Sequence, residues 1–132
     1  MIKQFSSYQI AGRGRAKTLG FPTINLKIPT NFYLKTGIYG VYILLNGLKY
    51  LGAMHYGMSP TFSDTEKSLE VFLIDTKNIS SFDQKINIQI IKYLRPVINF
   101  SSKIKLIKQI KEDVIQIKKF IFLSTLYFCL FS

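Results

Sequence analysis

The sequence predicts a mainly β fold, in which a closed or nearly closed antiparallel barrel is followed by a C-terminal α-helix. Strand and turn signals dominate the first three quarters of the 132 residues. Around Ser101 the spacing of apolar residues changes from two to three or four, which is the period of a helix. Strands first and one helix last are typical of a barrel with a helix packed on it.

The clearest strand pair spans residues 39–45 and 48–54, which flank Asn46-Gly47. An Asn-Gly pair between two apolar runs predicts a two-residue hairpin, because both turn residues must adopt positive φ. Residues 69–75 are apolar on both alternating faces, and this indicates a strand that is covered on both sides. In residues 85–93 the isoleucines fall on one face, as expected of a half-exposed strand.

The last quarter of the chain predicts an amphipathic helix that packs an isoleucine stripe on the barrel. Ser101 or Ser102 would cap its start. The stripe recurs at three- and four-residue spacing with lysines between its members, which are Ile104, Ile107, Ile110, Val114, Ile117 and Ile121.

Composition narrows the class of protein. The length suits one domain, and the single cysteine, Cys129, excludes an internal disulfide framework and a cysteine-rich zinc site. No apolar run follows Met1-Ile2-Lys3 as in a signal peptide, so we expect a cytoplasmic protein. The net charge of +11 attracts anions in general, nucleic acid and nucleotides alike.

A basic, glycine-punctuated loop reads GRGRAKTLGFPTIN at residues 12–25. Glycines let backbone N–H groups approach an anion closely, and the arginines and lysine add positive charge within five positions. Such a compact cluster favours a polyphosphate over an extended nucleic acid. On an extended segment Thr23 and Asn25 then point to one side, where a hydroxyl and an amide carbonyl offer hard oxygen ligands to a magnesium ion.

This loop and four further blocks resemble the riboflavin kinases, the flavokinase half of bacterial flavin-cofactor synthases. The pattern G-R-G-R-x-K-x-L-G-F-P-T-x-N-L matches from Gly12, and the resemblance covers roughly residues 8 to 118. The further blocks follow in the family's order: GIYGVY at 37–42, GAMHYGMSPTF at 52–62, LEVFLID at 69–75 and YLRP at 93–96.

The resemblance implies a six-stranded Greek-key barrel that moves the γ-phosphoryl of ATP to the 5′-hydroxyl of riboflavin, giving FMN and ADP. It implies magnesium, with zinc or manganese as alternatives, held by Thr23 and Asn25. The phosphate-binding residues that it implies are Gly12, Arg13, Gly14, Arg15, Lys17, Gly20, Phe21 and Pro22.

Glu70 is the candidate catalytic base. It shares a strand face with Phe72 and Ile74, an apolar setting that favours a raised pKa and suits a general base. From the residues alone, a strand-end glutamate with its carboxylate in solvent is the favoured interpretation. The resemblance favours catalysis, because the family's catalytic glutamate stands at this position of the E-x-x-L-x-D block.

Riboflavin contacts are expected from the 54–62 loop and from the segment at Arg95, since a flat heteroaromatic ring needs stacking faces and an apolar wall. His55 would alternatively bridge backbone groups of its turn. Ser59 departs from the family pattern, which typically has arginine there, and a serine lacks that forked donor set. The candidate contacts are His55, Tyr56, Thr61, Phe62 and Arg95.

Residues 120–132 form an apolar end beyond the predicted riboflavin kinase domain of residues 1–119. The segment is too short to span a bilayer, which needs about 20 apolar residues. Three roles stay open: a continuation of the helix over the core, an oligomer contact, or interfacial anchoring beside Lys118 and Lys119. Membrane contact is not the favoured one, and we expect a monomer.

Three functional hypotheses follow. The leading one is a riboflavin kinase without the adenylyltransferase domain of bifunctional relatives, which predicts FMN and not FAD as product. The second is a catalytically impaired relative that binds flavin or nucleotide, suggested by Ser59. The third is a basic small barrel that binds single-stranded nucleic acid, which we do not expect because the aromatic residues sit mostly in apolar strands.

Overall fold

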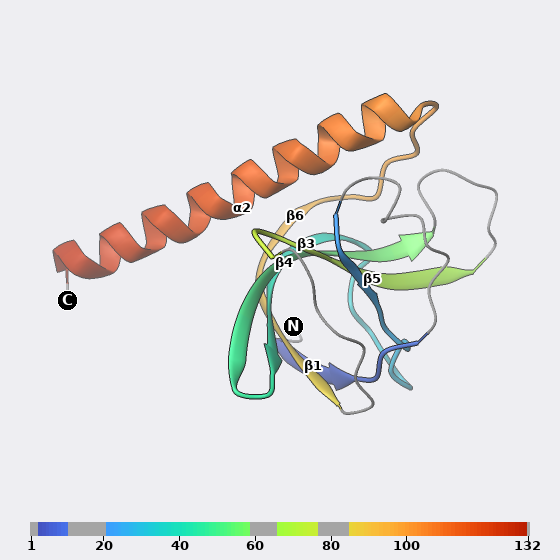
Figure 1. Ribbon diagram of the computed structural model, residues 1–132, viewed down its shortest axis with the longest axis horizontal. Helices are drawn as coiled ribbons and strands as arrows, with labels where there is room; N and C mark the ends of the chain where they lie inside the picture. The colour runs from blue at the N-terminus through green and yellow to red at the C-terminus, as the bar shows by residue number, and fades with distance from the viewer. Residues whose placement is uncertain (1–2, 11–20, 59–65, 77–84, 132) are drawn as a thin grey trace.

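The computed structural model describes residues 3–10, 21–58, 66–76 and 85–131. In these residues a curled antiparallel sheet is followed by one long helix (Figure 1). The elements are β1 (Gln4–Ser7), β2 (Thr23–Asn25), β3 (Gly37–Leu45), β4 (Leu48–Met58), β5 (Lys67–Leu73), β6 (Ile86–Arg95) and α2 (Lys103–Phe131).

The six strands form one sheet in the order β1-β6-β3-β4-β5-β2. The run β3-β4-β5 is a meander, and β6 returns to pair beside β3, which is Greek-key connectivity. Beyond β1 and β2 the two edges of the sheet meet: Gln9 bridges to Leu26, and the Ile10 N–H donates to the Asn25 carbonyl at 2.8 Å. The predicted six-stranded Greek-key architecture with a C-terminal helix is confirmed.

The predicted hairpin joins β3 to β4. Asn46 and Gly47 have φ of 50° and 76°, so both occupy the left-handed region that a two-residue turn of this kind demands. Strand β5 ends at Leu73, two residues before the predicted end, and Asp75 beyond it has a φ of 58° that an extended strand does not adopt.

The main hydrophobic core lies inside the curl of the sheet. Alternate residues of each strand enter it, because successive side chains of a strand point to opposite faces. Ile86 and Ile88 of β6 are fully buried, as the single-face pattern predicts. The largest fully buried members of this core are Leu26, Ile43, Met54, Leu69, Leu73, Ile86 and Ile88.

Two tyrosines pack together on this inner side. The rings of Tyr39 and Tyr93 meet edge to face with centroids 5.2 Å apart, and the Tyr39 hydroxyl donates to the Lys35 carbonyl at 2.5 Å. Burial raises the pKa of Tyr39 above its ordinary value, and the neighbouring Tyr93 raises that pKa further. The phenol is therefore held in its neutral, donating form.

Helix α2 packs on the outer face of the sheet. Ser102 is the capping residue, since its Oγ accepts the Lys105 N–H at 3.2 Å. Ile117 lies against the sheet so closely that a Cβ built on Gly40 would be 3.2 Å from its Cγ1. The predicted stripe is wrong at Ile104, which is 80% exposed. The buried residues of the helix are Leu106, Ile110, Asp113 and Ile117.

The helix continues through the predicted apolar end to Phe131, and Figure 1 shows it extending past the barrel. It does not cover the core there, because every residue from Phe122 to Phe131 is exposed. By length and composition alone the 29-residue helix is apolar enough to cross a membrane, with 6% of its most apolar window buried.

Candidate active site

The predicted base and one predicted metal ligand are direct neighbours across two strands. Asn25 of β2 is paired with Glu70 of β5, and Glu70 is paired on its other side with His55 of β4. Directly opposed residues of antiparallel strands point to the same face, with Cβ atoms roughly 4.5–5.5 Å apart. These three side chains therefore form one row on the outer face of the sheet.

Thr23 lies on the same face, one step further along β2. It is paired with Phe72 of β5, while the intervening Ile24 is buried in the core. The hydroxyl and the amide oxygen thus point to one side, as the sequence predicts, and the strand pairing places a carboxylate beside them. This set of hard oxygen donors fits magnesium, which is bound by a few protein oxygens with water and phosphate completing its shell.

Glu70 is half-buried, and its chain neighbours Leu69 and Val71 are buried in the core. They hold the backbone of β5 in place, since a shift of one residue would turn both leucine and valine toward the outer face. Phe72 shares the outer face with Glu70 and belongs to the apolar cluster beneath α2. The carboxylate is therefore fixed at the edge of an apolar patch.

A cavity of about 430 Å³ opens at the start of β2. Phe21 and Pro22 form one wall, and the Pro22 carbonyl accepts the Leu73 N–H at 2.9 Å, which ties the entry of β2 to the end of β5. The other lining residues are Leu73, Ile74, Asp75, Thr76 and, from α2, Val114. The sequence indicated Phe21 and Pro22 but gave no signal for the rest, which only the fold brings together.

The predicted riboflavin contacts separate onto two faces of the sheet. His55 is 4% exposed, and its Nε2 lies 2.9 Å from the Met58 carbonyl, which agrees with the alternative that it bridges its turn. It nevertheless shares the outer row with Glu70. Tyr56 is buried in the inner core, with its ring 5.0 Å from that of Phe32, and so lies on the opposite face from Glu70.

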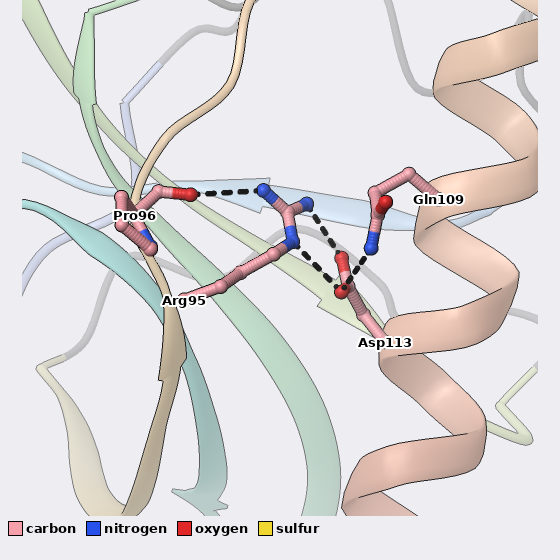
Figure 2. Close-up of polar contacts among 4 residues, drawn as sticks. All are labelled: Arg95, Pro96, Gln109 and Asp113. Atoms are coloured by element: carbon pink, nitrogen blue, oxygen red, sulfur yellow. Dashed lines mark hydrogen bonds and ion pairs between the residues drawn. The ribbon is translucent and has the colours of Figure 1, made fainter.

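Arg95 at the end of β6 forms the strongest polar link between the sheet and α2. Its guanidinium donates from Nε to Asp113 Oδ1 at 2.9 Å and from Nη2 to Oδ2 at 2.7 Å (Figure 2). Its Nη1 donates to the Pro96 carbonyl, and Gln109 Nε2 donates to the same carboxylate at 3.1 Å. Sequence reasoning missed Asp113, although it lies between Ile110 and Ile117 at helical spacing.

The remaining predicted site residues lie outside the described part of the chain. They are the phosphate-binding Gly12, Arg13, Gly14, Arg15, Lys17 and Gly20, and the riboflavin-binding Thr61 and Phe62. Ser59 lies outside it as well. Among the residues that are described, no three His, Cys, Asp or Glu side chains gather into a group that could hold a metal ion.

The fold is a small Greek-key β-barrel with an oxygen-rich row on its outer face. A family model for riboflavin kinase, Flavokinase, matches residues 3–121. The chain belongs to the riboflavin kinase family.

Relatives with curated functions agree. The chain is 37% identical over 122 residues to the bifunctional riboflavin kinase/FMN adenylyltransferase of Buchnera aphidicola subsp. Acyrthosiphon pisum, covering 90% of this chain and 39% of that protein. It is 33% identical to the human riboflavin kinase, covering 82% of this chain and 72% of that one. This chain therefore spans about two fifths of the first of these relatives and most of the second.

A solved structure supports the fold. The crystal structure of a protein described as a macrolide-efflux protein, from Streptococcus pneumoniae, superposes with a TM-score of 0.71 at 26% identity. The match covers 83% of this chain and 36% of that one.

Proposed function

We propose that this chain is an ATP:riboflavin 5′-phosphotransferase, which moves the γ-phosphoryl of ATP to the ribityl 5′-hydroxyl and releases FMN and ADP. The observation that carries this proposal is the direct pairing of Asn25 with Glu70 on the outer face, in a chain of the riboflavin kinase family. Phosphoryl transfer depends on positioning and charge neutralisation, and both need fixed groups of this kind.

Glu70 is the proposed base. Its carboxylate accepts the proton of the 5′-hydroxyl as the oxygen attacks the γ-phosphorus, and the P–O bond to the ADP leaving group breaks. Glu70 is half-buried and shares the outer face with Phe72, at the edge of the apolar cluster beneath α2. The rigid strand keeps the acceptor oxygen in place for an in-line transfer.

Thr23 and Asn25 would hold the divalent cation through a hydroxyl and an amide oxygen, with magnesium as the proposed metal and zinc or manganese as alternatives. When bound, a divalent cation neutralises the negative charge of the transferred phosphates. The two side chains point the same way because they are two residues apart on one strand.

The nucleotide is assigned to the basic loop of residues 12–20 and to the cavity that follows it. Phe21 and Pro22 continue directly from this loop into the wall of the cavity. At about 430 Å³ the cavity is within the usual size range of small-molecule sites, roughly 300–1,000 Å³. Its apolar walls suit a nucleoside, and the loop supplies positive charge for the phosphates.

The riboflavin contacts remain proposals at His55, Thr61, Phe62 and Arg95, together with Tyr56. The proposed product is FMN, made by a monomer in the cytoplasm without a nucleic-acid partner. The similarity to bifunctional proteins concerns only the part of them that this chain spans, and their adenylyltransferase activity is not assigned to it.

The test is FMN formation from riboflavin, ATP and magnesium, followed by chromatography that separates FMN from FAD. We expect turnover in the parent and a turnover rate about 10²-fold or more lower in Glu70→Gln, which is the usual contribution of acid–base catalysis. Glu66→Gln is the matched control, because Glu66 is an exposed glutamate just before β5 and should leave turnover unchanged.

Each alternative has its own result. A folded parent that binds riboflavin without turning it over would indicate the impaired, ligand-binding relative that Ser59 suggests. A folded parent that binds neither riboflavin nor ATP would overturn the proposal, and binding to single-stranded nucleic acid would then be measured.

A further inference from the structure

Helix α2 is divided into two parts with different surroundings. Up to Ile121 it belongs to the barrel: Ile117 is buried against Gly40, and Lys92 Nζ lies 4.7 Å from the centre of the Phe120 ring. From Phe122 to Phe131 every residue is exposed, and the family model ends at residue 121. We call Phe122–Phe131 the apolar tip.

The apolar tip is hydrophobic on all sides. Successive residues of a helix are turned by about 100°, so its eight apolar members point in every direction around the axis. Its two polar residues, Ser124 and Thr125, can return their hydroxyls to carbonyls of their own helix. The large exposed side chains are Phe122, Leu123, Leu126, Tyr127, Phe128, Leu130 and Phe131.

This distribution favours a surrounding apolar medium over a groove. A groove or a second helix covers one stripe of a helix and would leave the opposite side in water, whereas hydrocarbon covers the whole circumference. With residues such as Phe128 71% exposed, the tip would place a continuous apolar surface in water. Surfaces of that kind mark sites of protein or membrane contact.

The charge along α2 identifies the medium. Lys118 and Lys119 are exposed and lie just before Phe120 and the tip, and Lys118 pairs with Asp75 at 2.8 Å. Lys111 is exposed two turns earlier.

Of the two carboxylates of α2, Asp113 is paired with Arg95 and Glu112 is exposed, against six lysines of the same helix. Along α2, basic residues are therefore followed by an apolar end. The same order, charge first and then hydrocarbon, is met on passing from anionic headgroups into a bilayer. Lysines near such a surface are attracted to its anionic headgroups.

The apolar tip is long enough to enter the hydrocarbon of a bilayer. At 1.5 Å per residue it extends about 15 Å, which is half of a hydrocarbon core of about 30 Å. The preceding part of α2 cannot follow without leaving the barrel, because Ile110, Asp113 and Ile117 are buried there. The tip can therefore enter hydrocarbon while the barrel remains at the surface.

We propose that the apolar tip inserts into the hydrocarbon of an anionic lipid bilayer and holds the barrel at the membrane surface. The proposal does not depend on the enzymatic function, since it concerns residues beyond the candidate active site.

The first test is co-flotation of the full chain with vesicles of phosphatidylcholine alone or with about one third phosphatidylglycerol. We expect binding to the anionic vesicles, and at least a tenfold loss of binding in the double variant Leu126→Glu/Phe128→Glu. Ile104→Glu is the matched control: it adds a carboxylate at an exposed isoleucine of the same helix, outside the tip, and should retain binding.

A second measurement reports depth. The chain contains no tryptophan, so Phe128→Trp introduces a single indole into the tip, and Tyr33→Trp places one on an exposed site of the barrel. Brominated lipid chains should quench the first indole and leave the second unchanged. Absence of binding to anionic vesicles, or equal binding by the double-glutamate variant, overturns the proposal. A lipid-free dimer that the double variant dissociates, without vesicle binding, would assign the tip to a second copy instead.

Discussion

Asn25 of β2 and Glu70 of β5 are directly opposed across an antiparallel pair, and both point to the outer face of the barrel. The two strands are neighbours in the sheet, and β2 is one of the two edge strands of the described sheet. A short three-residue strand thus carries both Thr23 and Asn25, and its register against β5 alone sets their position relative to the carboxylate. The proposed metal ligands and the proposed base are therefore held by one pairing.

Asn25→Ala tests this arrangement. We expect the magnesium concentration for half-maximal FMN formation to rise at least about tenfold, because one oxygen donor is lost while Glu70 stays in place. The control is Asn87→Ala, an exposed asparagine of β6 that lies away from the row. A magnesium titration of initial rates measures the effect, and an unchanged midpoint in Asn25→Ala would remove Asn25 from the metal site.

The Arg95–Asp113 pair should contribute strongly to stability. The side chains are 16% and 7% exposed, so Asp113→Ala leaves a largely buried guanidinium without its carboxylate, and we expect a loss of about 3 kcal/mol in the free energy of unfolding. The exposed pair of Lys118 with Asp75 is the comparison. Lys118→Ala should cost less than about 1 kcal/mol, since solvent screens that pair. Urea unfolding measures both, and equal losses would contradict the assignment.

Close packing of α2 on β3 predicts an energetic coupling. Gly40→Val should cost about 2 kcal/mol, because the added side chain would overlap Ile117. The double variant Gly40→Val/Ile117→Ala should lose about 1 kcal/mol less in the free energy of unfolding than the sum of the two single losses. Truncation of Ile117 makes room for the valine. Gly40→Val with Ile110→Ala is the control and should be additive. Additive losses in the first pair would mean that the helix shifts away freely.

The raised pKa of Tyr39 predicts that the protein loses stability at alkaline pH. Its pKa is raised in the folded state by burial, so the folded protein holds the phenolic proton more tightly than the unfolded chain does. The stabilisation is fully present below the ordinary pKa of about 10 and is lost as the pH rises from there through the folded-state pKa. Urea unfolding between pH 8 and 11 should show a shallower decline in Tyr39→Phe than in the parent. The exposed Tyr33→Phe should follow the parent.

Local signals predicted much of the fold. Asn46-Gly47 fixed the β3–β4 hairpin because few other dipeptides accept two positive φ values, and the single-face isoleucines located β6. The helix face was less predictable. Hydrophobicity alone selects Ile104 and rejects Asp113, but Ile104 precedes the contact with the barrel and Asp113 is buried because Arg95 neutralises it. That partner is 18 residues away and on another element.

In the candidate site, too, local patterns were predictable and contacts between distant segments were not. Periodicity put Thr23 and Asn25 on one side of their strand, but the distance from Asn25 to Glu70 depends on the pairing of two strands whose sequences are far apart. Tyr56 shows the limit most clearly: it is adjacent to His55, and the alternation of the strand sends it into the core while His55 joins the outer row.

The position of β1 in the sheet bears on how this chain is made. Gln4 pairs with Gln89, about 85 positions later. During synthesis, β1 and one side of β3 therefore have no strand to pair with until β6 has been made. At 5–20 residues per second, a ribosome needs roughly 4–17 s to cover that interval. The nascent meander β3-β4-β5 meanwhile presents an unpaired edge, which is a template for strands of neighbouring chains. Completion of β6 thus ends the period in which aggregation competes most strongly with folding.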